Sequence, residues 1–298
     1  MAFQEFKWIS ELKTQPHPLL SLGIGDDCAL FGGVDQWSVS TDSMVEGTHF
    51  LARDDPFQVG RKLVNVNLSD MAAMGCQPDF FLLNVHVPED YPNENLYLLK
   101  EGMQEALTRF SCSLIGGDTV TFKKGPLSLV GTVIGHPFKE AAILRSGAKT
   151  NQLIAVTGAL GGSYPTRHMS FEPRLQWSKA LCQAGVPQAM MDISDGLLQD
   201  LGHILDASGV GADIDLDNVP IHSDVPSGSN ALKAALSDGE DFELLFTLDK
   251  SDIENIPNAI DYTVIGVITP ESGVLRGRDH SKCPFKLLSR LGYSHDQS

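Results

Sequence analysis

Apolar positions recur along this chain with two different periods, and together they predict an alternation of helices and strands. Residues 93–110 carry apolar side chains three and four positions apart, which is typical of an amphipathic helix. A similar spacing that ends at Gly75 predicts a helix over 59–75. Further helices are expected over 173–184 and 194–208. Short apolar runs between Gly, Pro and charged residues predict strands at 37–41, 80–87, 113–115, 127–134, 152–157, 189–193, 239–248 and 262–268.

This pattern is interrupted once, near the middle of the chain. A Gly-His-Pro run ends the first set of elements at Pro137, and the second set begins near Arg145. The chain has 298 residues, which is enough for two domains of about 150 residues each. We therefore expect an α+β fold with two lobes, an N-terminal domain over residues 1–138 and a C-terminal α+β domain over 139–298.

Composition narrows the classes of function. Lys and Arg total 22 against 38 Asp and Glu, a formal net charge of −16, which argues against a nucleic-acid partner. No apolar run is long enough to cross a bilayer, and the first residues do not resemble a signal peptide. The five cysteines include no CxxC pair, which indicates reduced thiols and no zinc site. We therefore expect a cytoplasmic protein without a membrane partner.

Acidic residues gather beside Gly, Ser or Thr, where the predicted strands end or the predicted helices begin. The groups are GDD at 25–27, STD at 40–42, SD at 69–70, GGDT at 116–119, DISDG at 192–196 and GED at 239–241. Any single group is explained by a helix cap or a turn. Six such groups without an adjacent Lys or Arg suggest instead that several of these carboxylates meet in one cleft.

Converging carboxylates would need a counter-charge. Two unit charges 4 Å apart repel by about 4 kcal/mol at an effective dielectric constant of about 20. Oxygen ligands of this kind suit Mg²⁺ or Ca²⁺ better than zinc, and Mg²⁺ commonly binds substrate phosphates as well. Asp192 and Asp195 would share one face if both lay in the first turn of a helix. The chain has neither a P-loop nor the protein-kinase motifs, so a nucleotide would be bound by another architecture.

The acidic groups, taken in order with their flanking residues, resemble the thiamine-monophosphate kinase family. This family belongs to the superfamily that includes aminoimidazole ribonucleotide synthetase. The resemblance extends from about residue 20 to about residue 270. It is carried by GIGDDCAL (23–30), STDSMVEGTHF (40–50), GRKLVNVNLSDMAAMG (60–75), LIGGDT (114–119), RSGAK (145–149), the run 156–161, MDISDGLLQDLGHIL (191–205) and DGEDFELLFT (238–247).

The resemblance implies ATP- and Mg²⁺-dependent phosphorylation of thiamine monophosphate to thiamine diphosphate, by direct in-line transfer. It also implies a homodimer in which the N-terminal mixed sheets form a β-barrel-like core. Several Mg²⁺ ions would be held by Asp27, Ser40, Thr41, Asp42, Asp70, Asp118, Asp192 and Asp195, with Asp26 adjacent. ATP would contact Gly117, Asp118, Arg145 and Ser194. His49 and Glu240 would contact the thiamine phosphate, and Tyr293 would bind the substrate by packing on a thiamine ring. Asp42 and Asp195 would be the catalytic residues.

The chemistry expected of such a site is consistent with its composition. A phosphate acceptor is already anionic and needs no general base, so the site needs mainly charge neutralisation. Arg145 and Lys149 are the expected cationic contacts to phosphate. The chain departs from the family between Gly162 and His168, where the family has about twenty more residues.

Three alternatives stay open. Aminoimidazole ribonucleotide synthetase and selenophosphate synthetase belong to the same superfamily, although the latter expects a reactive N-terminal Cys and residues 1–20 contain none. The third alternative is a non-enzymatic divalent-cation-binding protein, although the chain has no EF-hand loop.

Overall fold

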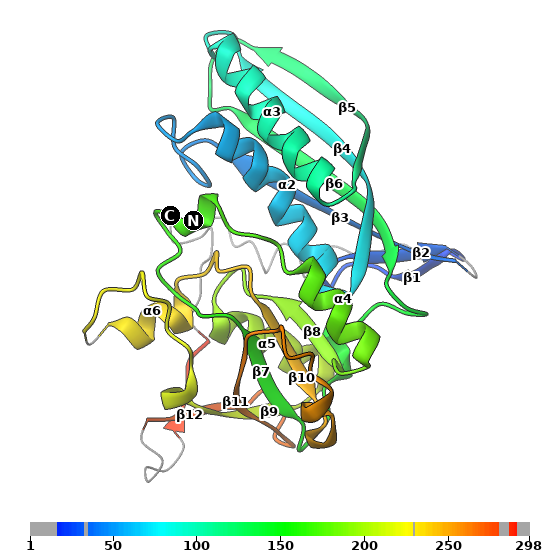
Figure 1. Cartoon of the computed structure of the whole chain (residues 1–298), viewed down its shortest axis with the longest axis vertical. Helices are drawn as coiled ribbons and strands as arrows, with labels where there is room; N and C mark the ends of the chain where they lie inside the picture. The colour runs from blue at the N-terminus through cyan, green and yellow to red at the C-terminus, as the bar shows by residue number, and fades with distance from the viewer. Residues whose placement is uncertain (1–16, 33–34, 229, 280–285, 291–298) are drawn as a thin grey trace.

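The computed structural model describes residues 17–32, 35–228, 230–279 and 286–290, which form two β-sheets with helices packed against them (Figure 1). The first sheet has six strands, and β4–β5 is a parallel pair within it. Its strands lie in the order β1 (Leu20–Leu22), β2 (Ala29–Gly32), β3 (Gln36–Val45), β6 (Ser128–Pro137), β4 (Cys76–Pro88) and β5 (Ser113–Phe122).

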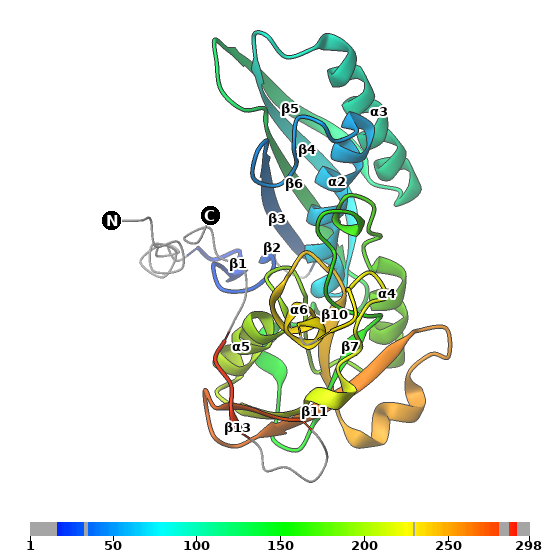
Figure 2. The same ribbon diagram turned by 90° about the vertical axis from the view of Figure 1, so that its left-hand side faces the viewer.

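Two helices, α2 (Pro56–Ala73) and α3 (Asn93–Arg109), cover one face of this sheet, as Figure 2 shows. The side chain of Asp55 caps α2 by accepting a hydrogen bond from the amide of Phe57 at 3.0 Å. The helices pack closely where they meet, because a Cβ on Gly60 would lie 2.0 Å from the carbonyl oxygen of Leu99. A larger residue at Gly60 would therefore force the helices apart.

The second sheet has seven strands. They lie in the order β13 (Lys286–Leu287), β12 (Leu275–Arg278), β9 (Gly211–Asp215), β11 (Tyr262–Thr269), β7 (Leu153–Thr157), β10 (Leu244–Leu248) and β8 (Ala189–Asp192). The helices of this half are α4 (Leu175–Ala184), α5 (Leu197–Ser208) and α6 (Ala231–Ser237). The chain is therefore a mixed α+β fold with two sheets, and the described residues form no closed barrel.

Helix α2 joins the two halves. Its Asn65 side chain donates to the carbonyl of Phe171 at 2.8 Å, and the carbonyl of Ala72 accepts from Ser178 on α4 at 2.6 Å. The principal apolar core is continuous across this junction, since it contains Leu63 of α2 and Phe246 of β10. The two sheets thus share one core, and α2 has a fixed position between them.

The structure confirms the two helices of the first half closely and corrects several other expectations. Strands β3 and β5 are longer than predicted, so Asp42 and Asp118 lie inside strands and not at their ends. Helix α5 begins only at Leu197, so Asp192 and Asp195 precede it and do not share its first turn. The predictions missed β1, β2, β9, β12, β13 and α6. No described helix is both long enough and apolar enough to span a membrane.

Candidate functional site

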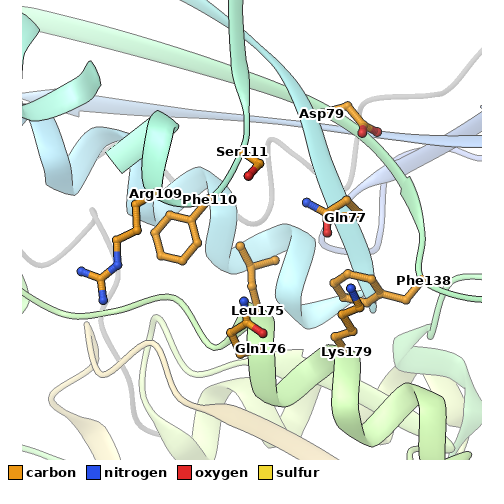
Figure 3. Close-up of a pocket in the computed structure, with 9 residues that line it drawn as sticks. All are labelled: Gln77, Asp79, Arg109, Phe110, Ser111, Phe138, Leu175, Gln176 and Lys179. Carbon is orange, nitrogen blue, oxygen red and sulfur yellow. The ribbon is translucent and has the colours of Figure 1, made fainter. Parts of the chain in front are cut away.

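The larger of two prominent cavities, about 670 Å³, lies between β3, α2 and loops of the second half. The residues from the predicted site that line it are Asp42, His49, Asp70, Asp192, Ser194, Asp195 and Glu240. The other cavity, about 420 Å³, lies between the end of α3, the start of β4 and α4 (Figure 3). Arg109 and Lys179 line it, and it includes none of the predicted site residues. The larger cavity is therefore the candidate active site.

Carboxylates distant in sequence converge at this cavity. One oxygen from each of Asp27, Asp70 and Asp192 lies within 4.8 Å of the others. Ser40 donates its hydroxyl hydrogen bond to Asp70, and Ser69 donates to Asp192 at 2.5 Å. Four of these five residues come from the first half, two of them on α2, whereas Asp192 ends β8 in the second sheet. The shared core therefore assembles an acidic cluster from both halves.

Three carboxyl groups that line the cavity, those of Asp42, Asp70 and Asp192, have pKa values raised above the ordinary value. Burial, reinforced by the charges of Asp195 and Asp27, raises the pKa of Asp42 to about 6. Burial and the charge of Asp27 raise the pKa of Asp192 to about 7. The pKa of Asp70 is also raised well above its ordinary value, first by burial and then by Asp42 and Asp192. Burial is the main cause of these shifts, and repulsion between carboxylates that meet in one cleft adds to it.

Arg145 supplies the counter-charge in the cluster. Its guanidinium donates to both carboxylate oxygens of Asp27, at 2.7 and 3.0 Å, and its backbone amide donates to Asp26 at 3.1 Å. One cation does not neutralise the whole set, since the pKa of Asp26 is still raised to about 6, by burial and by Asp27. Carboxylate and hydroxyl oxygens with excess negative charge fit a Mg²⁺ site, because this ion prefers such hard ligands.

Two of the predicted metal ligands lie elsewhere. Side chains alternate along β3, so Thr41 faces the side of the sheet opposite Ser40 and Asp42. Its hydroxyl donates to the carbonyl of Gly131 at 2.7 Å. Asp118 is exposed on edge strand β5, three strands from Asp42, which corresponds to about 14 Å at about 4.8 Å per strand. Within one chain, the structure therefore does not bring Asp118 or the Thr41 side chain to the cluster.

Gly117 has a packing role in this sheet. It pairs with Leu83 of β4, and a Cβ at this position would lie 1.8 Å from the carbonyl oxygen of Leu83. The close approach of β4 and β5 therefore requires a glycine here, whatever else this residue contacts.

At the other end of the cavity, Glu240 is held by a buried lysine that the sequence reasoning missed. The Nζ of Lys62 donates to Glu240 at 2.8 Å and to the carbonyl of His49 at 2.9 Å. It also lies 2.9 Å from Nδ1 of His168, and this Nδ1 is 3.0 Å from Glu240. The carboxylate is thereby fixed, and these cationic and ring partners hold its pKa below the ordinary value against the effect of burial.

The remaining predicted residues are placed as follows. Nδ1 of His49 accepts a hydrogen bond from the amide of Val45 at 3.1 Å, so the proton of a neutral ring lies on Nε2. Ser194 lines the cavity beside Asp195, whose carboxylate accepts from Gln199 at 3.1 Å. Tyr293 lies outside the described residues.

Comparisons with known proteins identify the family of this chain. Residues 25–136 match the family model for the N-terminal domain of AIR synthase related protein, and residues 153–276 match that for its C-terminal domain. The thiamine-monophosphate kinase of Buchnera aphidicola subsp. Acyrthosiphon pisum is 36% identical over 332 residues, covering 99% of each chain. That of Escherichia coli (strain K12) is 36% identical over 309 residues, covering 93% of this chain and 92% of the relative. The chain belongs to the thiamine-monophosphate kinase family.

A solved structure of this family has the same fold. AaThiL complexed with AMPPCP and TMP superimposes with a TM-score of 0.81 at 28% identity, covering 91% of each chain. Membership of the thiamine-monophosphate kinase family confirms the resemblance read from the acidic groups. Those groups did not indicate Lys62 and Tyr164, which line the cavity, or His168, which contacts Lys62.

Proposed function

We propose that this chain transfers the γ-phosphoryl group of ATP to thiamine monophosphate in a Mg²⁺-dependent reaction that yields thiamine diphosphate. The observation that carries the proposal is the cavity in which Asp42, Asp70 and Asp192 converge opposite the Lys62–Glu240 pair. The relatives named thiamine-monophosphate kinase, and the related structure with the ATP analogue AMPPCP and TMP, supply the substrates.

The residues divide into two groups by their chemistry. Bound Mg²⁺ would neutralise the phosphate charge between the two polyanionic substrates. It would be held by Asp27, Ser40, Asp42, Asp70, Asp192 and Asp195, with Asp42 and Asp195 nearest the transferred group. Arg145 and Ser194 would bind the ATP phosphates, and Lys149 would add a second cation near them. His49 and Glu240 would bind thiamine monophosphate, with His49 donating from Nε2.

The acceptor oxygen needs no base, because a phosphate monoester is anionic at neutral pH. We therefore propose direct transfer in line, without a phosphorylated enzyme intermediate. ATP made chiral at the γ-phosphorus tests this step, because one direct transfer inverts the configuration at phosphorus. Retention would indicate two successive transfers and would contradict this part of the proposal.

A homodimer is the second part of the proposal. The N-terminal domain, residues 1–138, would hold ATP and Mg²⁺ and pair with a second copy in a barrel-like core, and residues 139–298 would complete the substrate cavity. Strand β5 supports this, because Leu114, Ile115 and Val120 are 44–55% exposed along it. Pairing there would enclose Gly117, Asp118 and the Thr41 side chain, which lie away from the cluster in one chain.

Transfer of label from [γ-³²P]ATP tests the activity. Wild-type protein should label thiamine monophosphate, but neither selenide nor an aminoimidazole ribonucleotide precursor. Labelled selenophosphate, or release of labelled inorganic phosphate that requires the aminoimidazole ribonucleotide precursor, would identify another enzyme of the superfamily. No use of ATP with any of these substrates would favour a cation-binding protein. Asp42→Asn should abolish turnover at saturating Mg²⁺ while the protein stays folded, and near-full activity would refute the metal role of Asp42.

A further inference from the structure

The short segment between Gly162 and His168 places an aromatic ring at the cavity. Tyr164 lines the cavity together with Glu240 and His49, and its side chain is 58% exposed. Its ring centroid lies 4.9 Å from that of His168, with an angle of 49° between the planes. The ring is therefore supported on one side and available to a ligand on another.

The backbone around Tyr164 is fixed by the loop that carries Glu240. Ser163, which is fully buried, donates its hydroxyl hydrogen bond to the carbonyl of Glu240 at 2.6 Å. Arg167 donates to the carboxylate of Asp241 at 2.8 Å. Because the residues before and after Tyr164 are both anchored to the 240–241 loop, the ring has a defined place beside the Glu240 carboxylate.

Thiamine monophosphate, the acceptor in the proposed function, carries a permanent positive charge on its thiazolium ring. A quaternary cation is attracted to the electron-rich face of an aromatic ring, most strongly where water is excluded. Among the residues that the structure describes, the other phenylalanines and tyrosines of the cavity are Phe50 and Phe242, which are 3% and 6% exposed, so their rings are packed into the core. Tyr164 presents far more ring surface to a ligand than either of them.

We propose that Tyr164 is a specificity-determining residue that binds the thiazolium cation through its ring face, next to Glu240. This inference rests on the proposed function. It adds that the segment 163–167 recognises the thiazolium ring of the acceptor, thiamine monophosphate. The phenol hydroxyl has no role in it, so Tyr164→Phe should behave like the wild type. Tyr164→Leu keeps an apolar, although shorter, side chain and removes the aromatic face.

The experiment compares two ligands by calorimetry in the presence of AMPPCP and Mg²⁺. One is thiamine monophosphate, and the other is its 3-deaza analogue, in which a neutral thiophene replaces the thiazolium. Wild type and Tyr164→Phe should favour the charged ligand by about 3- to 30-fold. Tyr164→Leu should lose this preference while its affinity for AMPPCP stays unchanged. Tyr97→Leu, which alters a 63% exposed tyrosine on α3, is the matched control and should retain the preference.

Each outcome separates the inference from the proposed function. Retained discrimination in Tyr164→Leu would overturn the role of Tyr164, although the wild type would still phosphorylate thiamine monophosphate. If Tyr164→Leu weakened the binding of AMPPCP only, the Tyr164 ring would contact the nucleotide and not the thiazolium, which would also overturn the inference. No binding of thiamine monophosphate by the wild type would overturn the inference and the proposed function together.

Discussion

Replacement of Lys62 by Met tests whether the buried lysine organises the acceptor end of the cavity. Lys62 is 1% exposed, and its ammonium group contacts the Glu240 carboxylate, the His49 carbonyl and the His168 ring. Met preserves the length and packing of the stem but removes the charge and every hydrogen bond. The substitution leaves the Glu240 carboxylate without its lysine partner while the surrounding core keeps its volume.

The cost follows from the burial of the two partners. Removing one member of a fully buried ion pair costs about 3–5 kcal/mol. The Glu240 side chain is 30% exposed and water can reach part of it. We therefore expect Lys62→Met to lower the free energy of unfolding by about 2–3 kcal/mol. Since the unfolding entropy is about 2.1 cal/mol/K per residue, each kcal/mol lowers the Tm of a 298-residue chain by about 1.6 °C. The expected decrease in Tm is therefore about 3–5 °C.

Differential scanning calorimetry measures this decrease, and Lys100→Met, at an exposed position on α3, is the control that should stay within about 1–2 °C of the wild type. Glu240→Gln and the double variant complete a cycle in which the two losses should not add, because they remove one shared interaction. The KM for thiamine monophosphate should rise more than kcat falls, since Lys62 positions a substrate-binding group. A Tm within 1 °C of the wild type for Lys62→Met would refute the reasoning.

Three other outcomes are expected. Asp42→Asn should raise the Tm of metal-free protein in scanning fluorimetry, because it removes a repelled buried carboxyl; a lower Tm would contradict this. The pKa values of Asp42 and Asp192 are raised from 3.8 to about 6 and about 7, so the folded state binds protons more tightly than the unfolded chain. The resulting stabilisation is complete only below the unfolded pKa of 3.8 and is lost as the pH rises through 6–7. From pH 5 to 8, the Tm of the metal-free wild type should therefore fall more than the Tm of the double variant Asp42→Asn/Asp192→Asn. If Tm changed equally with pH in both proteins, Asp42 and Asp192 would not be the source of the pH dependence. Ile115→Glu should convert a dimer into monomers in sedimentation velocity, whereas an unchanged dimer would place the interface elsewhere.

The sequence predicted those parts of the fold where one face of an element is apolar. Residues 93–110 were predicted as a helix, and α3 covers Asn93–Arg109, because its buried side chains repeat at helical spacing. Strand β5 was predicted only over 113–115, since its Gly-Gly-Asp-Thr stretch lies exposed at a sheet edge and has no apolar alternation. Its extension depends on backbone pairing with β4, which leaves no pattern in the side chains.

The candidate site shows the same division. Carboxylates beside glycine were conspicuous in the sequence, and most of them meet. Lys62 could not be recognised as a site residue from the sequence, because a lysine in an amphipathic helix ordinarily faces water. Its partner Glu240 also lies 178 positions away. The separation of Asp118 from Asp42 was equally hidden, since it depends on the order of the strands and not on any local spacing.

The position of α2 has a consequence for how ligands enter. Asp70 near its end and Ser69 beside it meet Asp192 of the second half, and apolar residues of both halves pack on the same helix. A hinge rotation of one half away from the other would disrupt this packing and separate the carboxylates of the cluster. We therefore expect ligands to enter through small movements of surface loops, while the two halves keep their relative positions. For the same reason, neither half is expected to fold when it is expressed without the other.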